Sequence, residues 1–171
     1  AHLAGAGVDV LLLDIVPPDG KGGRNAFAAG GKEKALKAKP AAFFSTRDAD
    51  RITVGNLEDD LAAAAKCDLV IEVVKEDLKV KRDLFADLDQ AVAEDTILAT
   101  NTSALSVTSI AERVAHPERV LGLHFFNPAP VLPLVEVVAA AHSAPWAVER
   151  AAAIVEGWGK TAIRVADSPG F

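Results

Sequence analysis

Apolar residues along the chain fall into short continuous runs that are separated by stretches with helical spacing. The clearest helical stretch is 78–93, where Leu78, Phe85, Leu88 and Val92 form one apolar stripe. Strands that alternate with helices predict an α/β fold, with a doubly wound, mostly parallel sheet covered by helices on both faces. Strands are predicted at 8–14, 51–54, 68–74, 96–99, 120–124, 134–138 and 161–165, and further helices at 24–39, 61–66, 106–114 and 145–158.

The first residues contain Gly5-Ala6-Gly7, which looks like half of a dinucleotide-binding glycine fingerprint. A phosphate-binding glycine loop must follow a strand and open a helix, because the helix N-terminus supplies free N–H groups. Here the strand follows the glycines. Gly5 and Gly7 are therefore predicted to form a helix C-cap and turn, with residues 1–4 as the last turn of a helix.

Composition narrows the class of protein. The chain has 171 residues, half of them apolar and a quarter charged, which is typical of one globular domain. Its net charge of −6 argues against a nucleic-acid surface, and no apolar run reaches the length of a membrane span. The single cysteine, Cys67, cannot form an internal disulfide, which suits a cytoplasmic protein.

Ligands of parallel α/β sheets bind beyond the carboxyl ends of the strands. Asp14 ends the first strand, where a carboxylate can accept hydrogen bonds from an adenosine ribose and repel a 2′-phosphate. The alternative is a solvated loop carboxylate. Asn101-Thr102-Ser103 follows another strand and can hold a substrate oxygen and a cofactor, although capping of the next helix by Ser103 is favoured from the pattern alone.

His124 ends a strand and is a candidate general base. Glu136 lies within the next apolar strand, where a carboxylate is costly unless it is paired. The sequence therefore predicts a His124–Glu136 pair in which the glutamate fixes the imidazole tautomer. The alternative is a structural histidine with Glu136 paired elsewhere.

Together these residues resemble the NAD-binding domain of the 3-hydroxyacyl-CoA dehydrogenase family, which has a Rossmann-like fold. The segment from Pro17 to about Asp60 resembles the version found in bacterial multifunctional fatty-acid oxidation proteins. The matching stretches are DLVIEVVKEDLKVKRDLF (68–85), ILATNTSALSVTSIA (97–111), RVLGLHFFNPAPVLPLVEVV (119–138) and GKTAIRVADSPGF (159–171).

The resemblance implies NAD-dependent oxidation of a 3-hydroxyacyl-CoA to a 3-ketoacyl-CoA in β-oxidation, in a homodimer or a multienzyme complex. No metal site is predicted. Lys32, Lys34 and Lys37 are candidates for CoA phosphate, but a solvated helix face is the favoured interpretation. The implied roles are His124 as base, Glu136 as its partner, Ser103 at the substrate oxygen, Asn101 near the nicotinamide, Asp14 at the adenosine ribose, Glu76 and Lys81 near the nicotinamide ribose, and Asn127 as a residue that shapes its loop.

The resemblance also implies that residues 1–171 form an incomplete NAD-binding domain. The family's first strand and glycine-rich loop precede the part that matches, and a helical domain follows it. We therefore expect this chain alone to bind NAD weakly and to turn over poorly. The alternatives are an inactive fragment, a non-catalytic NAD-binding or structural relative, and another Rossmann oxidoreductase acting on a branched hydroxy acid. His124, Glu136 and Ser103 together argue against decay of the site.

Overall fold

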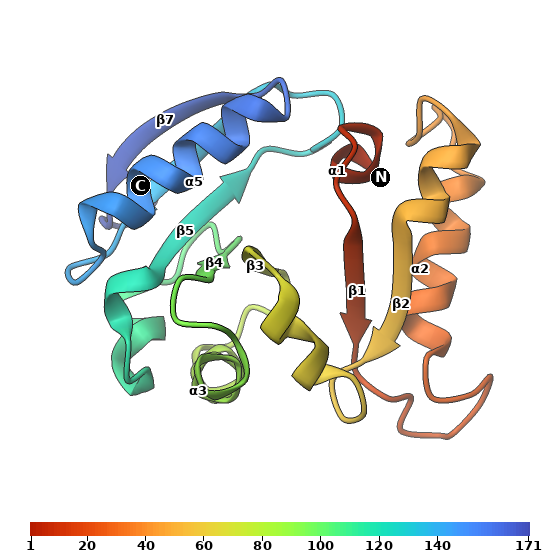
Figure 1. The fold of residues 1–171 in the computed structure, drawn as a ribbon, viewed down its shortest axis with the longest axis horizontal. Helices are drawn as coiled ribbons and strands as arrows, with labels where there is room; N and C mark the ends of the chain where they lie inside the picture. Colours follow the sequence, from red (N-terminus) through yellow and green to blue (C-terminus); the bar gives the residue numbers. More distant parts are fainter. The chain divides into compact units, whose positions relative to one another are not determined.

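A computed structural model describes residues 1–171, which divide into two compact units, Ala1–Ala63 and Ala64–Phe171. Figure 1 draws the first unit in red to orange and the second from yellow to blue. Each unit contains one sheet, two-stranded in the first and five-stranded in the second. No helix is long and apolar enough to cross a membrane.

The first unit is built on a parallel pair of strands, β1 and β2, whose register runs from Val10 opposite Ile52 to Asp14 opposite Asn56. A small core of Ala4, Phe43, Ala49 and Ile52 is buried within the unit. Gly7 adopts a positive φ of 85°, as predicted for the turn, whereas Gly5 lies inside the first helix. The elements are α1 (His2–Gly5), β1 (Val10–Asp14), α2 (Ala26–Leu36), the 3₁₀ helix η1 (Thr46–Arg51) and β2 (Ile52–Asn56).

The second unit has the strand order β3-β4-β5-β6-β7, and every neighbouring pair is parallel except β5 and β6. The 3₁₀ helix η2 (Leu61–Lys66) precedes its first strand. The remaining elements are β3 (Leu69–Glu72), α3 (Leu78–Ala91), β4 (Ile97–Thr100), α4 (Val107–Ile110), η3 (Ala111–Arg113), η4 (Pro117–Arg119), β5 (Val120–Phe125), β6 (Leu134–Ala139), α5 (Pro145–Gly157) and β7 (Thr161–Ala166).

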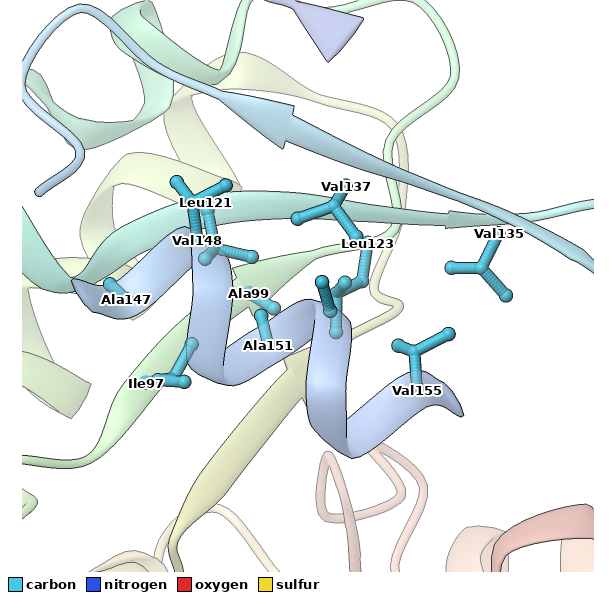
Figure 2. Packing of buried hydrophobic residues seen from close by; sticks show 11 residues of the cluster. Ile97, Ala99, Leu121, Leu123, Val135, Val137, Ala147, Val148, Ala151 and Val155 are labelled. Atoms are coloured by element: carbon cyan, nitrogen blue, oxygen red, sulfur yellow. The ribbon is translucent and has the colours of Figure 1, made fainter. Parts of the chain in front are cut away.

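The main core lies between α5 and the sheet of the second unit (Figure 2). Alternate strand residues point to one face of a sheet, and residues three or four apart share one face of a helix. Three of the buried α5 residues are alanines, so the helix lies close to the strands. The buried members are Ile97, Ala99, Leu121, Leu123, Val135, Val137, Ala147, Val148, Ala151, Ala152 and Val155.

The structure confirms the α/β class and the predicted elements, with differences that have local causes. The strand predicted at 68–74 ends at Glu72, because the Glu72 carboxylate accepts the Val74 N–H at 2.6 Å. β1 and β3 are half-buried, with residues of intermediate exposure except the exposed Asp14 and the buried Glu72. The helix predicted at 24–39 is shorter (α2), and the one predicted at 106–114 is α4 followed by η3.

Helix α3 buries charged residues that the apolar stripe did not predict. Its buried positions are Lys81, Phe85, Leu88 and Asp89. Asp89 pairs with the buried Arg119, whose Nη2 lies 2.6 Å from Asp89 Oδ1. Lys81 pairs with the buried Glu72 of β3, so the helix packs through two internal ion pairs as well as through its apolar side chains.

Gly122 in β5 tests how tightly the sheet is packed. A Cβ at this position would lie 2.8 Å from Val138 Cβ and 3.2 Å from Val107 Cγ2. We expect Gly122→Ala to lower the free energy of unfolding by about 1–3 kcal/mol through overpacking, measured by urea denaturation. Gly157→Ala is the control, because a Cβ there meets nothing within 4 Å. It should be neutral or stabilising, and equal effects of the two substitutions would contradict the packing argument.

Candidate active site

The antiparallel pairing of β5 with β6 places His124 directly opposite Glu136. Side chains of such opposed residues share one face of the sheet and lie within reach of each other. His124 Nδ1 lies 2.7 Å from Glu136 Oε2, and both side chains are largely buried, at 18% and 13% exposure. The contact predicted from the sequence is therefore present.

The partner of Nδ1 determines which imidazole nitrogen is left for chemistry. A carboxylate only accepts hydrogen bonds, so the proton of the neutral ring sits on Nδ1 and is donated to Glu136. Nε2 then carries the free lone pair. The pair is thus arranged to take up a proton at Nε2, with Glu136 stabilising the positive charge that results.

Two phenylalanine rings flank the imidazole. The ring of Phe126 lies 4.8 Å from that of His124, tilted by 50°, and the ring of Phe171 lies 5.9 Å away. Tilted contacts at these distances are favourable for aromatic rings. Both rings therefore lie against the imidazole, and neither was predicted from the sequence as part of the site.

Asn101 joins the end of β4 to the residue after His124. Its Oδ1 accepts the N–H of Phe125 at 2.9 Å, and its own N–H donates to the Glu72 carbonyl at 2.9 Å. Because Oδ1 is engaged, the amide NH₂ is the group that remains to donate. Asn101 therefore offers a hydrogen-bond donor whose place is fixed by its bond to Phe125, the residue that follows His124.

Ser103 is exposed on the loop after β4. The favoured interpretation, that it caps the next helix, is wrong. The N-cap of α4 is Ser106, whose Oγ accepts the Ser109 N–H at 3.2 Å. Ser103 lies three residues before this N-cap, within the loop, which leaves its hydroxyl free for another role.

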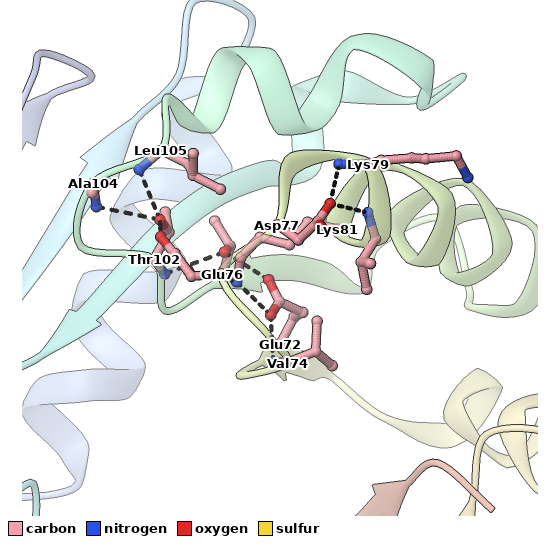
Figure 3. A network of polar contacts seen from close by, with 11 residues as sticks. Glu72, Val74, Glu76, Asp77, Lys79, Lys81, Thr102, Ala104 and Leu105 are labelled. Carbon is pink, nitrogen blue, oxygen red and sulfur yellow. Dashed lines mark hydrogen bonds and ion pairs between the residues drawn. The ribbon is translucent and has the colours of Figure 1, made fainter. Parts of the chain in front are cut away.

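A buried polar network lies at the carboxyl ends of β3 and β4 (Figure 3). Glu72 Oε1 accepts from Lys81 Nζ at 2.7 Å, and Glu72 Oε2 accepts from Thr100 Oγ1 at 2.7 Å. The Glu72 and Lys81 side chains are 0% and 1% exposed. Such a buried pair is stable only when its hydrogen bonds are satisfied, as they are here.

Glu76 extends this network toward the surface, with 43% of its side chain exposed. Its carboxylate accepts hydrogen bonds from Thr102 Oγ1 and from Lys81 Nζ, the latter at 3.2 Å (Figure 3). Burial opposes the charged form, but the hydrogen bonds from Thr102 and Lys81 outweigh it and lower the pKa of Glu76. Glu76 is therefore a fixed and ionised acceptor at the strand ends.

Lys81 was predicted near a ribose, and the structure places it inside the protein. Its ammonium contacts the carboxylates of Glu72 and Glu76. Of these two partners, only Glu76 is partly exposed at the surface. The contact between Lys81 and Glu76 was not predicted from the sequence, which placed both residues near a ribose only through the family resemblance. Thr102, which is also buried, was not predicted from the sequence to bind Glu76.

Asp14 belongs to the first unit and is exposed at the carboxyl end of β1. Its Oδ1 accepts the Ile15 N–H at 2.8 Å, which leaves acceptor capacity on the carboxylate.

Of the three lysines considered for CoA phosphate, Lys32 donates to the Ile52 carbonyl at 2.8 Å and Lys37 pairs with Glu33. Lys34 is exposed. This arrangement matches the solvated-face interpretation better than a phosphate site.

Asp167 is a further residue that the sequence analysis missed. It follows β7 and accepts hydrogen bonds from Ser106 Oγ at 2.8 Å and from the N–H groups of Val107 and Thr108. Burial of Asp167 is outweighed by these bonds, which lower the pKa of its carboxyl. The residue fixes the start of α4, and thereby the end of the loop that carries Asn101 and Ser103.

No group of three or more His, Cys, Asp or Glu side chains is arranged to hold a metal ion.

Comparison with known proteins adds the family context. The family model for "3-hydroxyacyl-CoA dehydrogenase, NAD binding domain" matches residues 1–168. A probable 3-hydroxyacyl-CoA dehydrogenase of Deinococcus radiodurans is 41% identical over 174 residues, which cover all of this chain and 50% of that protein. The 3-hydroxyadipyl-CoA dehydrogenase of Escherichia coli is 49% identical over 112 residues, or 66% of this chain and 24% of that protein.

A similar fold is found among solved structures. The crystal structure of 3-hydroxybutyryl-CoA dehydrogenase from Escherichia coli is 37% identical, with a TM-score of 0.80 over 99% of this chain and 35% of that one. The present chain therefore spans between about a quarter and a half of the length of these relatives.

The buried network allows a test of its ion pair. Lys81→Met leaves the Glu72 carboxylate buried without its counter-charge, and we expect the free energy of unfolding to fall by about 3–5 kcal/mol. The double substitution Glu72→Gln with Lys81→Met removes both charges and should cost less than Lys81→Met alone. Urea denaturation of the single and double variants measures the difference. Additive losses would contradict the assignment of Glu72 as the main partner of Lys81.

Proposed function

Because this chain belongs to the 3-hydroxyacyl-CoA dehydrogenase family and matches the NAD-binding domain of that family, we propose that it serves in the NAD-dependent oxidation of a 3-hydroxyacyl-CoA to a 3-ketoacyl-CoA. The observation that carries this proposal is the 2.7 Å contact between His124 Nδ1 and Glu136 Oε2. A base held by a carboxylate is what removal of a hydroxyl proton requires.

In this proposal His124 takes the proton of the substrate's 3-hydroxyl at Nε2. As the C3–H bond breaks and the C3–O double bond forms, that proton must leave, and the imidazole receives it. Bound NAD supplies the acceptor for the hydride that departs from C3. Glu136 keeps Nδ1 protonated throughout and stabilises the imidazolium.

Ser103 and Asn101 are proposed to orient the reacting groups. The exposed hydroxyl of Ser103 donates to the substrate's 3-oxygen. The amide NH₂ of Asn101, held in place through the Phe125 N–H, is a suitable donor to the carboxamide oxygen of a nicotinamide. These donors align the substrate and cofactor carbons, which supplies much of the rate enhancement in such transfers.

The residues present fit NAD. Asp14 offers an exposed carboxylate at a strand end, which suits the two hydroxyls of an adenosine ribose and repels a 2′-phosphate. Glu76 offers an ionised acceptor at the ends of β3 and β4, and is proposed to bind the nicotinamide ribose. Lys81 contributes by holding Glu76 in place from the interior.

The substrate class is supported by the relatives. The Escherichia coli proteins are named for 3-hydroxyadipyl-CoA and 3-hydroxybutyryl-CoA, both of which are CoA thioesters of 3-hydroxy acids. The shared group is the 3-hydroxyl on a thioester, and His124 acts on that group. We therefore propose a role in fatty-acid oxidation or in related degradation of 3-hydroxyacyl thioesters.

Replacement of His124 tests the base directly. We expect His124→Gln to lower kcat/KM by about 10²–10⁴-fold, because the hydroxyl proton loses its acceptor. The rate is followed by NADH absorbance with a short-chain 3-hydroxyacyl-CoA. His142→Gln is the matched control, since His142 is exposed on the loop before α5. Unchanged activity of His124→Gln would remove this residue as the base, and an inactive full-length gene product would refute the proposed function.

Replacement of Asp14 tests the cofactor site without turnover. We expect Asp14→Asn to weaken NAD binding by about tenfold, because an amide is a poorer acceptor for two ribose hydroxyls than a carboxylate. It should weaken NADP binding less, because the repulsion of the 2′-phosphate is removed. Titration calorimetry measures both affinities, with Asp87→Asn on the exposed face of α3 as a control of equal charge change. Equal loss for both dinucleotides would contradict the assigned role.

A further inference from the structure

The loop between β5 and β6, residues 126–133, starts two residues after His124 and ends three residues before Glu136. It contains Pro128, Pro130 and Pro133, and proline has no N–H to donate. Most of the loop is exposed. Within it, the N–H groups of Val131 and Leu132 both donate to the Pro128 carbonyl, at 2.9 and 3.0 Å. The loop therefore has few backbone bonds of its own to fix its shape.

Lys160 supplies hydrogen bonds to this loop from outside it. Its Nζ donates to the carbonyl oxygens of Ala129 at 2.5 Å and Leu132 at 2.7 Å. The residue is only 7% exposed, and its ammonium contacts these carbonyls rather than a carboxylate. The next residue, Thr161, donates its N–H to the Pro133 carbonyl at 2.8 Å. The start of β7 thus holds the loop at three carbonyl groups.

Burial of a lysine in this position costs free energy. Burial disfavours the charged ammonium, and it lowers the pKa of Lys160. Two carbonyl dipoles compensate the charge less well than a carboxylate does. A lysine here is explained by the geometry it imposes, because a single flexible side chain with several N–H groups can bind two carbonyls of one loop at once.

The loop in turn touches the candidate base. Phe126 is its first residue, and the Phe126 ring lies 4.8 Å from the His124 imidazole. We propose that Lys160 is a positioning residue for His124: it fixes the β5–β6 loop so that Phe126 packs against the imidazole and keeps the ring aligned with Glu136. The catalytic consequence rests on the proposed function, but the positioning itself does not.

The test uses nuclear magnetic resonance of the histidine ring protons, which needs no turnover. The chain has four histidines, so the His124 signals are assigned by their absence in His124→Gln. The ring current of Phe126 shifts these signals in the wild-type protein, and Phe126→Leu shows their position without it. We expect Lys160→Met to move them toward the Phe126→Leu position, and the double variant to equal Phe126→Leu alone.

Two matched variants separate positioning from general damage. Lys160→Arg keeps the buried charge and can donate to both carbonyls, so it should retain wild-type signals. Lys66→Met removes an exposed lysine of the same unit and should change nothing. If Lys160→Met does not fold, as judged by the remaining histidine signals, Lys160→Gln replaces it. Signals of His124 that stay in place in a folded Lys160→Met or Lys160→Gln protein would overturn the proposal, as would additive shifts in the double variant.

Activity provides a second readout. Loss of positioning should lower kcat of Lys160→Met by about tenfold while KM changes little, because the base is displaced but the binding groups remain. Lys160→Arg should restore most of kcat. An active wild-type enzyme whose Lys160→Met variant keeps full kcat would contradict the inference alone. An inactive full-length gene product would instead count against the proposed function, and the ring-proton shifts would still decide the role of Lys160.

Discussion

The single antiparallel pairing in the five-stranded sheet is the constraint on which the candidate site depends. Because β6 runs against β5, His124 and Glu136 are direct neighbours on one face of the ladder. Their contact needs no long-range adjustment, only the register between two adjacent strands. A slip of this register by one residue would turn one of the two side chains to the other face and separate the imidazole from the carboxylate.

Buried charges hold the surroundings of this pair. Glu72 with Lys81 fixes the ends of β3 and α3, Asp89 with Arg119 fixes the far part of α3, and Lys160 fixes the loop after β5. Each of these groups is costly to bury, and each has its hydrogen bonds satisfied. Exposed polar groups near the carboxyl ends of the strands are thus supported by buried, hydrogen-bonded residues, which suits the alignment of two reactants in the proposed reaction.

The sequence predicted the strands, the α/β class and the His124–Glu136 contact, because apolar runs and a lone carboxylate within one have clear physical costs. The same reasoning applied to Glu72, which also lies in an apolar strand, would have predicted a buried partner. Its partner Lys81 was not evident, since helical spacing alone does not reveal where a long side chain ends. Ser106, and not Ser103, caps the helix, because α4 starts at Val107 and the N-cap is the residue directly before the helix. The direction of β6 depends on pairing between strands, which periodicity does not report.

The hydrogen bond between Asn101 and Phe125 explains why an amide suits position 101 better than its closest isostere. An aspartate would accept the same backbone N–H and would fit the same space. It would, however, offer no donor on its outer side, and it would add a second negative charge beside the strand that already opposes Glu136. The hydrogen bond to Phe125 thus fixes which end of the amide accepts, and it leaves the NH₂ group as the donor that position 101 can offer to a ligand.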